Sequence, residues 1–142
     1  MIKVFISQPM KGKSDEEIKL TRSIIERIVQ KKLNNEADII DSYFEDYPCA
    51  KGHKNIALKY LAKSIDKLAD ADVFFHLTDA GFNRGCAIEE RCADYYGIIC
   101  HMLTMKEIKE NATKEERKRL IQLQAESSIN LRVERELEEE HE

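Results

Sequence analysis

The stretch DVFFHL, residues 72–77, is a continuous apolar run with the length of one β-strand. A similar run, IKVFI, covers residues 2–6, and IICHML covers residues 98–103. Strands of a half-exposed sheet alternate apolar and polar side chains, whereas strands covered on both faces are apolar throughout. These runs therefore predict a parallel sheet with helices on both faces.

Segments with helical periodicity separate these runs. Ser14 and Glu17 form a capping-box pattern at the start of a helix that extends to about residue 33. The other predicted elements are a strand at 37–41 and helices at 54–70 and 86–96. The order β-α-β-α-β-α-β predicts an α/β fold with a Rossmann-like or flavodoxin-like parallel sheet of four to five strands, although a fifth strand is not evident.

The sequence changes character after residue 103. Thr104 with Glu107, and Thr113 with Glu116, repeat the capping-box pattern, and the chain from residue 114 is strongly charged with sparse apolar positions. We expect one long helix or two shorter ones that pack on the core or meet a second subunit, with a partly disordered tail as the alternative. The predicted domains are an α/β domain, 1–112, and a charged helical extension, 113–142.

The composition is that of a soluble protein with a polar surface. The 142 residues suffice for one domain with its own core, and the net charge of −4 disfavours binding to polymeric nucleic acid. No apolar run approaches the roughly 18–20 residues of a membrane span. The cysteines form no C-x-x-C pair, and no signal peptide is recognised, so we expect free, mostly buried thiols in the cytoplasm. The four are Cys49, Cys86, Cys92 and Cys100. No ligand spacing predicts a metal, and we expect no cofactor.

A binding site is expected beyond the carboxyl ends of the parallel strands, where the loops that lead into the helices gather. The candidate residues in these loops are Ser7, Gln8, Lys11 and Gly12 after the first strand, Asp41 after the second, and Asp79, Arg84 and Gly85 after the third. A basic residue beside a glycine at the start of a helix can hold a phosphate, and the alternative is a polar turn with lysines in water.

Two glutamates follow the third of these loops, in the helix NRGCAIEERCADYYG (83–97). Glu89 has Cys86, Cys92 and Ala93 as helical neighbours, whereas Glu90 has Asp94 and is expected closer to solvent. A carboxylate near a helix N-terminus stays ionised, which suits a nucleophile. The alternative is that Glu89 only complements the helix dipole.

The segments KVFISQPMKGK, ADADVFF and NRGCAIEERCADYYG together resemble the nucleoside 2-deoxyribosyltransferase-like superfamily, especially its small, often phage-encoded members. The resemblance covers about residues 2–103. It implies cleavage or transfer at the N-glycosidic bond of a (deoxy)nucleoside or nucleoside 5′-monophosphate. By this resemblance Glu89, in Gly85-Cys86-Ala87-Ile88-Glu89, is the nucleophile, Asp72 contacts the substrate, and Lys11-Gly12 binds the 5′-phosphate.

Three residues depart from the family pattern. Ser64 stands where many members have an acidic residue, Phe5 has no hydroxyl to orient a nucleophile, and Asn83 replaces an acidic residue of some transferases. These departures allow a changed substrate or lost catalysis. Asp72 or Asp79 would serve the leaving base or the sugar, and Arg84 would help to hold a phosphate unless it pairs with Glu90.

We therefore expect an N-glycosidase or deoxyribosyltransferase-like enzyme that acts on a small nucleoside or nucleotide. The alternatives are a nucleotide-binding regulatory module without turnover, and an assembly protein whose tail is the functional part. The sparse apolar stripe of the tail also predicts a homodimer or a higher homo-oligomer.

Overall fold

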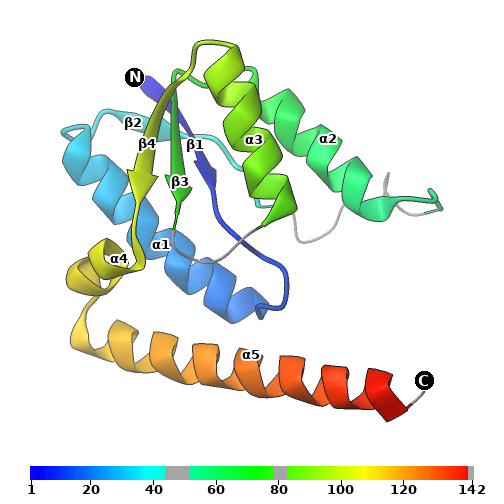
Figure 1. The fold of residues 1–142 in the computed structure, drawn as a ribbon. Helices are drawn as coiled ribbons and strands as arrows, with labels where there is room; N and C mark the ends of the chain where they lie inside the picture. The colour runs from blue at the N-terminus through cyan, green and yellow to red at the C-terminus, as the bar shows by residue number, and fades with distance from the viewer. Residues whose placement is uncertain (44–51, 79–82, 141–142) are drawn as a thin grey trace. The chain divides into compact units, whose positions relative to one another are not determined.

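The computed structural model describes residues 1–43, 52–78 and 83–140 (Figure 1). Its four strands are β1 (Ile2–Ser7), β2 (Ala37–Ile39), β3 (Val73–Leu77) and β4 (Ile99–Leu103). They form one parallel sheet in the order β2-β1-β3-β4. This is the order of a flavodoxin-like sheet without its fifth strand. The predicted α/β fold with a parallel sheet is confirmed.

Five helices accompany the strands: α1 (Asp15–Lys32), α2 (Ile56–Leu68), α3 (Arg84–Tyr95), α4 (Met105–Asn111) and α5 (Lys114–Glu140). Each helix that was predicted from periodicity is present within a few residues of its expected bounds. The charged C-terminal segment forms a short helix and a long one, so the predicted helical extension is also confirmed.

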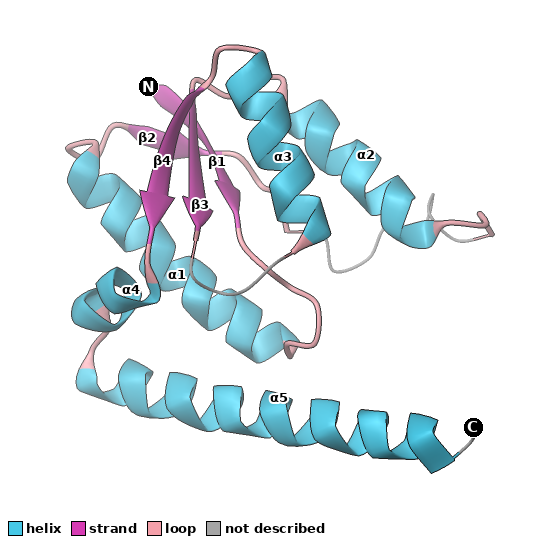
Figure 2. Ribbon diagram, viewed as in Figure 1, coloured by secondary structure: helices cyan, strands magenta, loops and turns pink. Residues whose placement is uncertain are grey.

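Helices α2 and α3 lie on one face of the sheet (Figure 2). A compact apolar cluster fills the space between these helices and the sheet. Phe5 on β1 stacks on Phe74 on β3, with ring centroids 5.9 Å apart. Leu68 of α2 and Ala93 of α3 complete the buried set. Full burial of a phenylalanine stabilises a fold by about 1.5–3 kcal/mol, so this pair stabilises the packing of the helices on the sheet.

The opposite face of the two central strands is also buried. Val4 and Ile6 on β1 and Phe75 and Leu77 on β3 are all core residues. Both faces of β1 and β3 therefore lie away from water, which is why their sequences are apolar without alternation.

Strand β4 does not share this property, although the sequence predicted uniformly buried strands. Ile99 is 63% exposed and Met102 is 66% exposed, and only Leu103 is buried. The physical reason is position: β4 is an edge strand with a neighbour on one side only. An apolar run of strand length cannot distinguish an edge from a centre.

The chain divides into two compact units. One consists of Met1–Pro9 and Val29–Met105 and contains the sheet, and the other consists of Met10–Ile28 and Lys106–Glu142. The second unit has its own buried apolar residues, which are Ile18, Ile24, Ile25, Ile28, Ile108, Ala112, Leu120 and Leu123.

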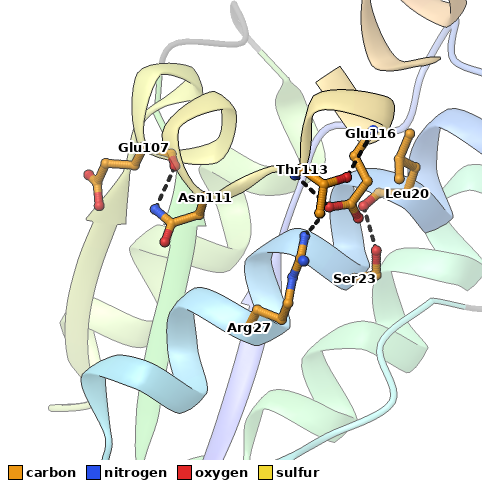
Figure 3. A network of polar contacts seen from close by, with 7 residues as sticks. All are labelled: Leu20, Ser23, Arg27, Glu107, Asn111, Thr113 and Glu116. Atoms are coloured by element: carbon orange, nitrogen blue, oxygen red, sulfur yellow. Dashed lines mark hydrogen bonds and ion pairs between the residues drawn. The ribbon is translucent and has the colours of Figure 1, made fainter. Parts of the chain in front are cut away.

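Polar contacts connect the helices of the second unit (Figure 3). Thr113 and Glu116 form the predicted capping box: the Thr113 amide donates to Glu116 Oε1 at 2.8 Å, and the Glu116 amide donates to Thr113 Oγ1 at 3.1 Å. Arg27 of α1 also donates to Glu116. This ion pair and the Thr113 amide lower the pKa of Glu116, with the amide the larger cause. The start of α5 is thereby tied to α1.

Glu17 is the most buried carboxylate of this unit, at 2% exposure. Ser14 caps α1 as predicted, because its Oγ accepts the Glu17 amide at 3.2 Å. The Glu17 carboxylate accepts from Ser127 Oγ of α5 at 2.8 Å and pairs with Lys13 at 3.3 Å. A contact between α1 and α5 therefore satisfies a buried charge.

Self-association was predicted from the sparse apolar positions of the tail. Of these, Leu120 and Leu123 are buried, whereas Ile129, Val133 and Leu137 are exposed. The homo-oligomer stays a prediction. Within the described ranges, no helix is long and apolar enough to cross a membrane.

Cys86, Cys92 and Cys100 are free. The first two are half-buried and Cys100 is exposed, so the expectation of mostly buried thiols was wrong for Cys100. Cys49 lies outside the described residues.

We expect Ser127→Ala to lower the free energy of unfolding by about 1–3 kcal/mol, because it removes a hydrogen-bond donor from a buried carboxylate. Urea denaturation measures this loss. Ser128→Ala is the matched control, since Ser128 is exposed on the same turn and the change in helix propensity is the same. Equal stabilities of the two variants would contradict a structural role for the Ser127–Glu17 contact.

Candidate functional site

The carboxyl ends of β1 and β3 bring two polar side chains together. Ser7, the last residue of β1, pairs in register with His76 of β3. Both are buried, and both share the face of Phe5 and Phe74, because side chains alternate along a strand. This places Ser7 and His76 at the end of the sheet where ligands bind in parallel α/β folds.

Helix α3 begins directly above this edge. Asn83 is its N-cap, and its Oδ1 accepts the Cys86 amide at 3.0 Å. The helix therefore starts at Arg84, two residues earlier than the sequence predicted. Asn83 departs from the acidic residue of some transferases, but it has a local role here because asparagine is among the best capping residues.

Glu89 lies in the second turn of α3 and is only 8% exposed. Ser7 Oγ donates a hydrogen bond to Glu89 Oε1 at 3.0 Å. Side chains on a helix point back toward its N-terminus, which directs this carboxylate to the carboxyl end of β1. Glutamate is almost never buried without a partner, so Glu89 is not an ordinary surface charge.

The Cys86 thiol joins the same cluster, one turn before Glu89. Burial raises its pKa to about 11, the nearby Glu89 charge acts in the same direction, and a hydrogen bond with Ser7 opposes them. At neutral pH this side chain is therefore a thiol and not a thiolate. Ser7, Cys86 and Glu89 form the centre of the candidate site.

Glu90 lies differently from its neighbour. Its side chain is half exposed, and its Oε1 is 3.8 Å from Nε2 of His76. The ring of His76 also packs in a tilted arrangement on Phe74, with centroids 5.5 Å apart. The position of His76 beside Ser7 could not be found from the sequence, because it depends on the register between β1 and β3.

The resemblance placed Asp72 in contact with the substrate. In the structure it lies at the opposite end of the strands, just before β3 begins. Its Oδ2 accepts the Lys3 amide at 2.9 Å, and its own amide donates to the Lys3 carbonyl at 2.8 Å. Ser7 is four residues further along β1, a rise of about 13 Å. The structure therefore does not bring Asp72 to Glu89, and the carboxylate of Asp72 joins the start of β3 to β1.

The remaining predicted residues are distributed as follows. Gln8 follows β1 and is buried. Asp41 is exposed and accepts the Tyr43 amide at 3.3 Å. Arg84 and Gly85 are the first two residues of α3, and Arg84 is exposed. Lys11 and Gly12 belong to the second compact unit, where both are exposed and Gly12 has a φ of +77°. Asp79 lies outside the described residues.

Ser42 contributes a further buried hydroxyl close to this edge. Its Oγ donates to the Ile6 carbonyl at 2.9 Å. Ser42 thus holds the loop after β2 against the end of β1. In the described part of the chain, no group of three or more His, Cys, Asp and Glu side chains is placed to hold a metal ion.

The comparisons with known proteins add no assignment. No family model matches the chain, and neither a curated protein nor a solved structure matches it.

We expect Cys86 to react slowly with iodoacetamide in the folded protein, since only the thiolate is nucleophilic. A pKa of about 11 in place of 9.0 reduces the thiolate fraction at pH 8 about 100-fold. Peptide mass spectrometry after timed alkylation measures the rate at Cys86, and the same cysteine in urea-unfolded protein is the reference. Equal rates in the two states would show that the thiol is not shielded.

Proposed function

We propose that this protein cleaves or transfers the N-glycosidic bond of a (deoxy)nucleoside or nucleoside 5′-monophosphate, with Glu89 as the nucleophile. The observation that carries the proposal is the buried Glu89 carboxylate, hydrogen-bonded to Ser7 at the carboxyl edge of a parallel sheet. The resemblance of residues 83–97 to the superfamily supports the same assignment.

The environment of Glu89 suits nucleophilic attack at an anomeric carbon. Ser7 donates to one carboxylate oxygen, which favours the ionised form. Attack by this oxygen forms a glycosyl ester and releases the base with the bonding electron pair. Water or a second base then attacks the same carbon from the opposite side, so configuration is retained overall.

The leaving base must receive a proton, and the sequence left Asp72 and Asp79 as alternatives for this role or for contact with the sugar hydroxyls. The Asp72 carboxylate accepts the Lys3 amide at the amino-terminal end of β1. Asp79 lies outside the described residues, so both aspartates stay candidates, with Arg84 as a candidate for contact with phosphate.

Glu89→Gln is expected to lower base release by about three orders of magnitude or more, since it removes the nucleophile and keeps the volume. The measurement is chromatography of released base after incubation with a panel of deoxynucleosides and their 5′-monophosphates. A 2′-fluoro substrate analogue should also leave a sugar adduct on the peptide that contains Glu89.

Glu90→Gln is the matched control and should retain turnover, because Glu90 is half exposed and its partner is His76. Full activity of both variants, or loss only in Glu90→Gln, would contradict the nucleophile assignment. Ligand binding without base release by the unmodified protein would instead support the nucleotide-binding module.

Lys11→Ala should weaken binding of 5′-monophosphates far more than binding of the matching nucleosides, if the lysine-glycine pair holds the phosphate. Calorimetric titration of both ligand types measures the difference. Lys118→Ala is the control, because Lys118 is an exposed lysine of the same compact unit. An equal loss for nucleosides and monophosphates would remove the phosphate role of Lys11.

A further inference from the structure

Ser7 was predicted to bind substrate, but its surroundings indicate a different task. It is only 2% exposed and lies at the last position of β1, where the register with His76 fixes the backbone. Its hydroxyl is directed at Glu89, with Oγ 3.0 Å from Oε1. A hydroxyl that is buried and already bonded to the carboxylate is poorly placed to contact a ligand.

The direction of the hydrogen bond follows from the chemistry of its two groups. A serine hydroxyl has one proton to give and an ionised carboxylate can only accept, so Ser7 donates to Glu89. The neighbouring Cys86 side chain remains a thiol at neutral pH, because burial raises its pKa to about 11.

We propose that Ser7 is the positioning residue of Glu89: its hydroxyl holds one carboxylate oxygen in place and keeps the group ionised beneath α3. Its catalytic consequence rests on the proposed function, whereas the contact itself does not. A glutamate side chain has three rotatable bonds, and a fixed donor on a buried strand removes much of that freedom. The donor also compensates for the water that a buried carboxylate has lost.

The decisive measurement is the titration of the Glu89 carboxyl carbon by ¹³C NMR, in the full chain labelled at glutamate. We expect Ser7→Ala to move the titration midpoint of Glu89 upward by about one pH unit, since a hydrogen bond to the charged form is lost. Ser7→Thr restores the hydroxyl and should return the midpoint toward that of the unmodified protein. Among the described residues, the titratable groups on the neighbouring elements include Cys86 on α3 and His76 on β3 with its partner Glu90, and all variants retain them.

Ser42→Ala is the matched control. Ser42 is a buried serine next to the end of β1, and its hydroxyl donates to the Ile6 carbonyl. The variant should therefore leave the midpoint unchanged while removing a hydroxyl of similar burial. An unchanged midpoint in Ser7→Ala, or an equal shift in Ser42→Ala, would overturn the proposal. If Ser7→Ala does not fold, Ser7→Cys replaces it, and the weaker thiol donor should give a smaller upward shift.

Kinetics on any substrate found active separate this proposal from the proposed function. A positioning role predicts that Ser7→Ala lowers kcat by about 10-fold or more with little change in KM, because the nucleophile is misplaced while the substrate still binds. A raised KM at unchanged kcat would show that Ser7 binds substrate and would overturn the proposal. If the unmodified protein releases no base, the proposed function fails, and the titration alone decides the role of Ser7.

Discussion

The parallel pairing of β1 with β3 is the constraint on which the candidate site depends. Its register sets Phe5 beside Phe74 and Ser7 beside His76. The same face of the two strands therefore presents apolar side chains to α3 in the middle of the strands and polar side chains at their carboxyl ends. The same register joins Asp72 to Lys3 at the opposite end of the strands. A shift by one residue would exchange the faces of every side chain on β1 and would remove Ser7 from Glu89.

A buried carboxylate at this position has a cost that its surroundings must offset. Glu89 loses water on entering the space beneath α3, and the hydrogen bond from Ser7 offsets part of this loss. In the second compact unit, the buried Glu17 carboxylate is stabilised in a similar way, because Ser127 donates a hydrogen bond to it and Lys13 pairs with it. The difference is location: Glu17 joins two helices, whereas Glu89 faces the edge of the sheet where substrates bind in this class of fold.

Much of the fold could be predicted from local patterns, because those patterns describe forces that act within a few residues. The runs IKVFI and DVFFHL indicated strands buried on both faces, and Thr113 with Glu116 indicated a helix start that the hydrogen bonds confirm. The exposure of Ile99 and Met102 could not be predicted, since it depends on which strand ends at the edge. The register between β1 and β3, two strands far apart in sequence, places Ser7 next to His76 and Asp72 far from Glu89. A local sequence pattern does not predict that register.

Two departures from the superfamily pattern have local explanations that leave the nucleophile assignment in place. Phe5, which has no hydroxyl, is one half of the stacked pair at the centre of the core. Two residues later on the same face of β1, Ser7 presents a hydroxyl to Glu89, and this spacing is the repeat of a strand. Asn83 caps α3 with its side-chain oxygen, a role that an acidic residue fills equally well at a helix start. Phe5 and Asn83 therefore both have a structural role in this fold, one in the core and one at the start of α3.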